Sequence, residues 1–296
     1  MRKVWIEAAL NGPWGRERQP GIPVDIEEII ADGVAAAEAG AAIIHVHAYD
    51  VSTGRQRDEW EIYACIIEGI RSKVDAIVYP TIPLAGSDFA AANAERRFAH
   101  TAELAKRGLI EWAVVDPGSV NFVRFDEIDT SLDFFIYQNP LPDIREGLRI
   151  AREHHVRPGY AIYEPGFTRL GAAFAEAVPN LPTPIYRFMF SDEFAWGFPP
   201  RPAHLDAHLE LLSSVAPKAP WMVAGLGVDI RPLIAPAVAR GGHVRVGLED
   251  APWRTPLTNR DWVQEAVRLI REAGCEPAIA AQVRASLDAI DLARVA

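Results

Sequence analysis

The chain has 296 residues, of which 49% are hydrophobic and 24% charged, and its 40 acidic residues outnumber its 30 Lys and Arg residues. This length suits a single α/β barrel as well as two domains. The formal net charge of −10 argues against a general nucleic-acid surface, because phosphate backbones are bound by concentrated Lys and Arg. It does not exclude a small anionic ligand, since a few local arginines can bind a phosphate or a carboxylate.

The sequence carries no mark of a membrane or secreted protein. It has no apolar run of about 18 residues, and the residues after Met1 lead into a strand-like segment rather than a signal peptide. We therefore expect a cytoplasmic protein without a membrane partner. Cys65 and Cys275 lie far apart inside helical patterns, so we expect two buried thiols and neither a disulfide nor a cysteine metal cluster.

Short apolar runs alternate with helical patterns along the chain. The runs that predict strands are residues 4–9, 42–47, 75–80, 112–115, 160–163, 185–190, 221–225 and 244–248. The patterns that predict helices are residues 26–39, 60–73, 93–107, 141–154, 168–177, 203–215, 230–239 and 261–273.

This alternation predicts parallel strands joined by crossover helices. Eight such units in about 250 residues predict a (β/α)8 TIM barrel, with a doubly wound open sheet as the alternative. No linker or low-complexity segment divides the sequence, so we expect one domain over residues 1–296. Residues 278–294 predict a short additional helix that packs on the barrel or on a neighbouring subunit.

Two histidines, His45 and His47, stand at the end of the second predicted strand. Side chains two apart in a strand share a face, so both imidazoles can converge on one point. Glu249 ends the eighth predicted strand, and active sites of (β/α)8 barrels gather at the carboxyl ends of the strands. Two histidines and a carboxylate are a common ligand set of catalytic zinc, and they also suit iron, cobalt or manganese. The alternative for the histidines is a hydrogen-bonded polar pair.

Arg245 shares a strand face with Glu249 and should point into the barrel, where an unpaired guanidinium is costly. Its anion could be Asp250, Glu7 or a substrate carboxylate. Asp50 either orients one imidazole or only opens the following turn.

Two further features have simpler interpretations. His204 and His208 are four residues apart on a predicted helix, where we expect solvent-exposed side chains rather than metal ligands. Residues 188–200 form an aromatic segment after the sixth strand, which could wall an apolar pocket, act as a lid or pack against another subunit.

The order and spacing of four segments resemble the β-keto acid cleavage enzymes. These segments are His-Val-His-Ala at 45–48 with a following Thr-Gly, Val-Ala-Gly-Leu-Gly at 223–227, Gly-Gly-His-Val-Arg-Val-Gly-Leu-Glu-Asp at 241–250, and Thr-Asn-Arg-Asp-Trp-Val-Gln-Glu-Ala-Val at 258–267. The similarity runs from residue 3 to about residue 290. It is more specific than any single motif.

The resemblance implies a zinc-dependent (β/α)8 barrel, commonly a homotetramer, that condenses a β-keto acid with acetyl-CoA. Cleavage then gives an acetoacetate-type product and a new acyl-CoA. The family's metal ligands correspond to His45, His47 and Glu249. Its arginine and aspartate on the eighth strand correspond to Arg245 and Asp250.

The implied mechanism combines a Lewis acid with a proton-transfer pair. Zinc would polarise the β-keto oxygen, while Asp250, oriented by Arg245, would move the proton. Arg245 could also neutralise the substrate carboxylate. The family's third-strand hydroxyl corresponds to Thr81, which would donate a hydrogen bond to a developing oxyanion.

Departures from the family pattern concern the substrate. Trp14 and Ala161 stand where aminohexanoate-cleaving relatives carry glutamates, and Asp116 stands where they carry an asparagine. We therefore predict a substrate that is less cationic and more apolar or aromatic than the amino-keto acid of those relatives. The predicted substrate-binding residues are Glu7, Asn11, Trp14 and Asp116.

Val228 stands where the family has an arginine in Gly-Ile-Gly-Arg, which weakens the inference that CoA is the partner. The alternative is therefore a metal-dependent hydrolase or carbon–carbon lyase that works without CoA. A barrel that binds a ligand and metal without turnover is a third possibility.

Overall fold

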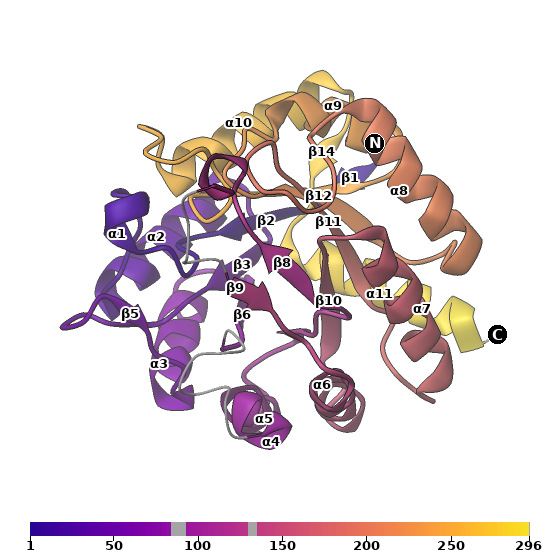
Figure 1. The fold of residues 1–296 in the computed structure, drawn as a ribbon, viewed down its shortest axis with the longest axis horizontal. Coiled ribbons are helices and arrows are strands. Elements are labelled where there is room, and N and C mark those ends of the chain that lie inside the picture. Colours follow the sequence, from indigo (N-terminus) through magenta and orange to yellow (C-terminus); the bar gives the residue numbers. More distant parts are fainter. Residues whose placement is uncertain (84–92, 130–134, 296) are drawn as a thin grey trace.

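The computed structural model describes residues 1–83, 93–129 and 135–295. Eight parallel strands form one sheet that curves into a barrel, and helices surround it (Figure 1). The prediction of a (β/α)8 barrel is therefore confirmed. The barrel strands are β2 (Ile6–Ala9), β3 (Ile43–Val46), β6 (Ile77–Pro80), β7 (Trp112–Val114), β10 (Arg157–Ile162), β11 (Ile185–Phe190), β12 (Trp221–Gly225) and β13 (His243–Val246).

The strand order β6-β3-β2-β13-β12-β11-β10-β7 follows the chain around a ring. β13 pairs with β2, so the last barrel strand lies beside the first, with Arg245 opposite Glu7. β6 and β7 lie at the two ends of this order and contact each other, which brings the sheet round almost to closure. Strands that are remote in the sequence therefore open onto the same mouth.

The outer helices are α2 (Ile26–Ala39), α3 (Trp60–Arg71), α4 (Ala94–Arg97), α5 (Ala99–Lys106), α6 (Leu141–Glu153), α7 (Pro165–Ala177), α8 (Pro202–Val215), α9 (Arg231–Ala239) and α10 (Asn259–Glu272). α7 begins at Pro165, three residues before the predicted start. Proline fits the first turn of a helix because its missing N–H needs no partner there. Asp25 and Thr258 form capping boxes that fix the starts of α2 and α10.

The remaining short elements are β1 (Lys3–Val4), α1 (Gly15–Arg18), β4 (Tyr49–Asp50), β5 (Arg55–Gln56), β8 (Val120–Phe122), the 3-10 helix Phe125–Glu127, β9 (Phe135–Tyr137), β14 (Glu276–Pro277) and α11 (Ala280–Val295). β1 pairs with β14 beside the amino-terminal end of the barrel. α11 is the helix at the end of the chain that the sequence places at 278–294. Arg157 of β10 holds it through an ion pair with Asp291 at 2.7 Å.

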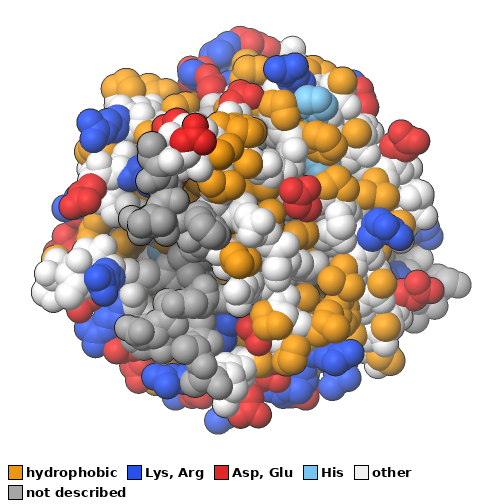
Figure 2. All heavy atoms as spheres, viewed as in Figure 1, with side chains coloured by type: hydrophobic (Ala, Val, Ile, Leu, Met, Phe, Trp, Pro, Cys, Tyr) orange, Lys and Arg blue, Asp and Glu red, His pale blue; other side chains and the backbone are white. Residues whose placement is uncertain are grey.

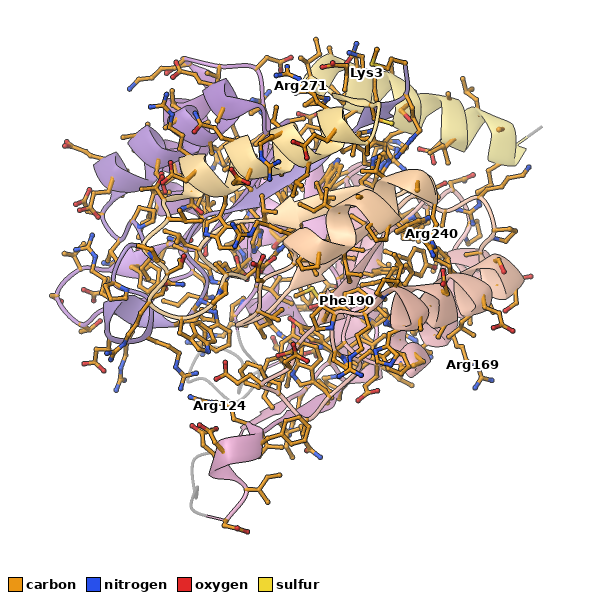
Figure 3. All side chains as sticks on the ribbon, turned by 90° about the horizontal axis from the view of Figure 1, so that it is seen from above. Lys3, Arg124, Arg169, Phe190, Arg240 and Arg271 are labelled. Atoms are coloured by element: carbon orange, nitrogen blue, oxygen red, sulfur yellow. The ribbon has the colours of Figure 1, made fainter. Side chains whose placement is uncertain are left out.

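The side chains inside the barrel lie in layers, as the alternation of strand residues requires. At the amino-terminal end, Trp5 stacks on His243 with ring centroids 3.8 Å apart and meets Trp112 at 6.4 Å. These rings close that end of the barrel. Figure 3 shows Lys3 and Arg124 at opposite ends of the molecule, and the 3-10 helix Phe125–Glu127 follows Arg124 directly.

Two local expectations are wrong. Cys65 is exposed on α3 and Cys275 is half-buried, so the two cysteines are not a buried pair. His208 is buried, because α8 turns it onto β11, where its ring stacks on Phe188 with centroids 4.5 Å apart. Among the described helices, none is long and apolar enough to cross a membrane.

Gly247 follows β13 at a point where two strands approach closely. Its φ is 135°, and a Cβ there would lie 2.2 Å from the carbonyl oxygen of Ala9. The same oxygen accepts a hydrogen bond from the backbone N–H of Glu249 at 3.2 Å. Glycine at this position therefore allows the chain to carry Glu249 across the end of β2.

We expect Gly247→Ala to lower the free energy of unfolding by about 3 kcal/mol or more, because backbone strain and a steric clash add together. Gly274→Ala is the matched control. Its φ is 73° but no atom lies within 4 Å of a Cβ, so the loss should be about 1 kcal/mol. Chemical denaturation measures both, and equal losses would contradict a close approach at Gly247.

Candidate functional site

The three predicted metal ligands meet at the carboxyl ends of the strands. The distance from His45 Nε2 to Glu249 Oε2 is 3.6 Å, and that from His47 Nε2 to Glu249 Oε1 is 3.5 Å. One ligand atom from each residue lies within 4.8 Å of the others, and all three side chains are buried. His45 lies in β3 and His47 directly follows it. The prediction that the eighth strand runs to residue 248 and ends at Glu249 is wrong, because β13 ends at Val246 and Glu249 lies in the turn that follows.

Several polar atoms of this cluster have no hydrogen-bond partner among the described residues. They are His45 Nδ1, His47 Nε2 and Glu249 Oε2. His45 faces Glu249 with its Nε2 atom, so its Nδ1 lies on the other side of the ring. His47 Nε2 and Glu249 Oε2 do belong to the cluster, and because buried polar atoms are normally paired, these two orphans fit a cation better than a closed polar pair. Burial lowers the pKa of His45 well below its usual range, although Glu249 acts in the opposite direction. The imidazole is therefore neutral, which is the form that a metal requires.

Gln56 orients His47. The Nδ1 atom of His47 lies 2.9 Å from Gln56 Oε1, and the Gln56 amide nitrogen donates to both Asp58 oxygens at 2.9 Å. Because the amide nitrogen of Gln56 faces a carboxylate, the amide oxygen of Gln56 faces the imidazole and accepts the proton on His47 Nδ1. The lone pair of His47 Nε2 is thereby directed at the cluster.

Asp50 does not orient either imidazole. Its carboxylate accepts from the Ser52 backbone N–H at 2.8 Å in the exposed turn between β4 and β5. Gln56 reaches His47 instead because β5 folds back onto β4 and pairs Gln56 with Tyr49. The turn residues after Asp50 signal such a return, but the partner residue depends on the register of the hairpin.

Arg245 contacts the carboxylates of Asp250, Glu7 and Glu249 at the same time. Its Nε and Nη2 donate to the two oxygens of Asp250 at 2.9 and 2.8 Å, and its Nη1 donates to Glu7 Oε1 at 3.0 Å. Its Nη2 also lies 2.8 Å from Glu249 Oε1. Burial alone would raise the pKa of Glu249, but Arg245 and the imidazoles outweigh it and hold that pKa well below the usual range.

A cavity lined by His45, His47, Arg245 and Glu249 lies at this end of the barrel. Glu7 does not line this cavity but contacts Arg245 from beneath it. Tyr79 donates to Glu7 Oε1 at 2.6 Å, and Arg187 Nη1 lies 3.3 Å from the same oxygen. Arg187 also donates to the Gly159 carbonyl at 3.2 Å. Sequence reasoning missed Arg187 and Tyr79, although an arginine at an inward position of the apolar β11 is a usable signal.

Asn11 also lies outside the cavity lining. Its side chain accepts from the His47 backbone N–H at 2.9 Å and donates to the His47 carbonyl at 2.8 Å and to that of Pro23 at 3.0 Å. Both ends of the amide are therefore used by the main chain. Asn11 fixes the backbone that carries His47.

Trp14, Thr81 and Asp116 do line the cavity. Trp14 Nε1 donates to the Glu249 carbonyl at 3.1 Å. Among the described residues, the Thr81 hydroxyl has one long contact of 3.4 Å, to the Ile82 carbonyl. Asp116 accepts from Tyr137 Oη at 2.6 Å and from a backbone N–H at 2.7 Å, and burial raises its pKa.

The rest of the wall is largely apolar and aromatic. Its apolar members include Ile82, Val114, Phe122, Ala161, Met189 and Leu226. The segment 188–200 contributes to this wall, because Phe194 and Trp196 pack on Phe122 with ring centroids 5.3 and 5.6 Å apart. Figure 2 shows hydrophobic side chains gathered on this face of the molecule.

The chain matches the family model described as beta-keto acid cleavage enzyme over residues 3–288. It is 28% identical to the 3-keto-5-aminohexanoate cleavage enzyme of Fusobacterium nucleatum, over 96% of this chain and 97% of that protein. It is 27% identical to the 3-dehydrocarnitine:acetyl-CoA trimethylamine transferase of Rhizobium meliloti, over 93% of each chain.

A third relative is the 3-oxoadipate:acetyl-CoA acetyltransferase of Cupriavidus necator, which is 26% identical over 95% of this chain and 93% of that protein. Among solved structures, the ternary complex of ObcA with a C4-CoA adduct and oxalate superposes with a TM-score of 0.72. At 16% identity, over 91% of this chain and 68% of that one, this likeness shows the shared fold.

We expect Gln56→Ala to weaken divalent-metal binding about tenfold to a hundredfold, because the orienting acceptor of His47 is lost. Competition with a chromogenic chelator measures the affinity directly. Arg55→Ala, an exposed change in the same hairpin, is the control and should bind metal normally. Unchanged affinity in Gln56→Ala would show that His47 needs no such partner.

Proposed function

Because the chain belongs to the β-keto acid cleavage enzyme family, we propose that it is a metal-dependent enzyme that exchanges acyl groups between a β-keto acid and acetyl-CoA. The proposed metal is zinc, held by His45, His47 and Glu249. The observation that carries this proposal is the position of Arg245, which contacts both the third ligand and Asp250. A homotetramer and a cytoplasmic location remain predictions from the sequence.

The donor set fits a resident divalent cation. It offers imidazole nitrogens and the Glu249 carboxylate, His47 Nε2 and Glu249 Oε2 have no hydrogen-bond partner among the described residues, and Gln56 orients His47 from behind. When bound, such an ion would supply Lewis-acid polarisation of the β-keto oxygen.

Asp250, which contacts Arg245 through both of its oxygens and does not itself line the cavity, is the proposed base. Burial raises its pKa to about 6 against the opposing effect of Arg245, so the carboxylate can take up and return a proton near neutral pH. It would remove a proton from the carbon between the keto and carboxylate groups. Every nitrogen of Arg245 already contacts a protein carboxylate, so Arg245 positions Asp250 rather than receiving the substrate carboxylate.

The carbon that loses the proton then bonds to the acetyl carbonyl carbon, and CoA leaves as its thiolate. Thr81, whose hydroxyl makes one long contact with the part of the chain that the structure describes, would donate to an oxyanion that develops in this step. The thiolate attacks the original keto carbon, and the bond between this carbon and the carbon that attacked breaks. Asp250 then returns the proton to the latter carbon. The products are acetoacetate and a new acyl-CoA, so all atoms of the two substrates are retained.

The cavity wall supports an apolar or aromatic tail on the β-keto acid. Val114, Ala161 and Leu226 offer no hydrogen bond from their side chains to an ammonium group, and Trp14 directs its only donor to a backbone carbonyl. Among the described residues, Asp116 and Glu249 are the carboxylates that line the cavity, and both oxygens of Asp116 already accept hydrogen bonds.

We expect the zinc-loaded protein, given acetyl-CoA and a panel of β-keto acids with aliphatic, aromatic, cationic and anionic tails, to form new acyl-CoA products fastest with the uncharged tails. Liquid chromatography with mass spectrometry identifies the products. Turnover of a β-keto acid without any thioester would favour the hydrolase or lyase alternative. Absence of turnover across the panel with a loaded metal site would overturn the transferase proposal.

Two substitutions separate the metal from the base. We expect His47→Ala to lose both metal and turnover. Asp250→Asn should keep the metal and lower kcat about 10²–10⁴-fold, because only the proton-transfer group is removed. Elemental analysis and steady-state kinetics measure these effects, and full activity in a metal-free variant would contradict the proposed role of the ion.

A further inference from the structure

The proposed reaction needs a site for the phosphates of acetyl-CoA, and the inference below rests on that reaction. In (β/α)8 barrels, phosphates are commonly bound by the loops after the seventh and eighth strands, which here follow β12 and β13. The first of these loops holds the buried Val228 and offers no free cation, because Arg231 pairs with Asp229 at 2.6 Å. The cation must come from elsewhere on the rim.

Arg18, at the end of α1, lies in a corner made by two indoles. Its Cζ is 5.7 Å from the ring centre of Trp14 and 5.4 Å from that of Trp253. The two indoles meet edge to face, with centroids 5.3 Å apart and planes at 77°. No carboxylate among the described residues pairs with Arg18, whereas its neighbour Arg16 pairs with Glu28.

Both indoles are fixed to the rim of the proposed active site. Trp14 lines the cavity and donates to the Glu249 carbonyl, and Trp253 donates to the Glu193 carboxylate. Glu193 is itself held by Arg124 at 2.6 Å. Figure 3 shows Arg124 at the end of the molecule opposite Lys3, which lies at the amino-terminal end of the barrel. The corner that holds Arg18 is therefore built beside the mouth.

Arg254 adds a second guanidinium in the loop after β13. It is exposed, follows Trp253 directly and pairs with no carboxylate in the described part of the chain. Its backbone has a φ of 58°, a left-handed conformation that a non-glycine residue rarely adopts. Such strain is concentrated at ligand-binding and catalytic sites.

We propose that Arg18, seated against Trp14 and Trp253, binds a phosphate of the nucleotide half of CoA, and that Arg254 binds alongside it. Arg18 lies 5.4 Å from the ring of Trp253, and Arg254 is the next residue in the chain, so both arginines belong to the same part of the rim. Neither pairs with a carboxylate among the described residues, and in a chain of net charge −10 such guanidiniums can attract a polyanion. The indoles hold the guanidinium of Arg18 in place, so little side-chain freedom is lost on binding. The thioester then extends from this rim toward Glu249.

The test compares two thioesters that differ in the nucleotide. Acetyl-CoA carries the phosphates, whereas S-acetylpantetheine carries the same thioester arm without them. We expect Arg18→Ala to raise KM for acetyl-CoA about tenfold, and the double variant with Arg254→Ala to raise it further, with KM for S-acetylpantetheine unchanged. The difference between wild type and Arg18→Ala should shrink as salt is added.

Arg169→Ala is the matched control, because Arg169 is an exposed arginine of α7 that points away from the molecule (Figure 3). It should leave both KM values unchanged. Equal effects of Arg18→Ala on both thioesters, or no effect on either, would overturn the assignment.

Calorimetric titration with CoA separates this inference from the proposed function. If the wild type binds CoA but forms no acyl-CoA product, the proposed function fails while binding still tests the site. Weaker binding in Arg18→Ala, with normal binding in Arg169→Ala, supports the site. Equal binding in all proteins, or none in the wild type, refutes it.

Discussion

The ion pairs between the buried guanidinium of Arg245 and three carboxylates are the interactions on which the site depends. A cation inside the barrel is tolerated only with anions around it, and Arg245 has carboxylates of Glu7, Glu249 and Asp250 within 3.0 Å. Each contact also fixes the orientation of a carboxylate. Because Glu249 is a proposed metal ligand and Asp250 the proposed base, one side chain sets the geometry of both.

The support for Arg245 comes from below the cavity. Glu7 joins it to Arg187 and Tyr79, so the network connects β2, β6, β11 and β13. These strands are remote from one another in the sequence, but each contributes one side chain to the same layer inside the barrel. A site built on strands in a close-packed barrel is held more rigidly than one built on loops. The loops are left free to determine which substrate tail and which co-substrate can enter.

The sequence predicts the parts of this site that depend on local periodicity. His45 and His47 follow from the two-residue repeat of strands, and the barrel itself follows from the alternation of elements. Glu249 does not follow from that repeat, because β13 ends at Val246 and the turn through Gly247 carries Glu249 to the site. Gln56, Tyr79 and Arg187 depend on hairpin register and on which strands become neighbours. The prediction that His208 is exposed is wrong for a related reason. Which side of a helix faces the sheet depends on packing, and local polarity does not reveal it.

Charge balance links the metal to the rest of the barrel. Around the cavity lie buried carboxylates and guanidiniums, namely Glu7, Asp116, Glu249 and Asp250 against Arg187 and Arg245. With all six of these described groups ionised, they carry two more negative than positive charges, an excess that a divalent cation would offset. The raised pKa of Asp250 allows a bound proton to offset part of the same excess when that carboxyl group has accepted one. The proposed ion would therefore stabilise the arrangement that binds it, and Asp250, the proposed base, is the group whose charge can vary.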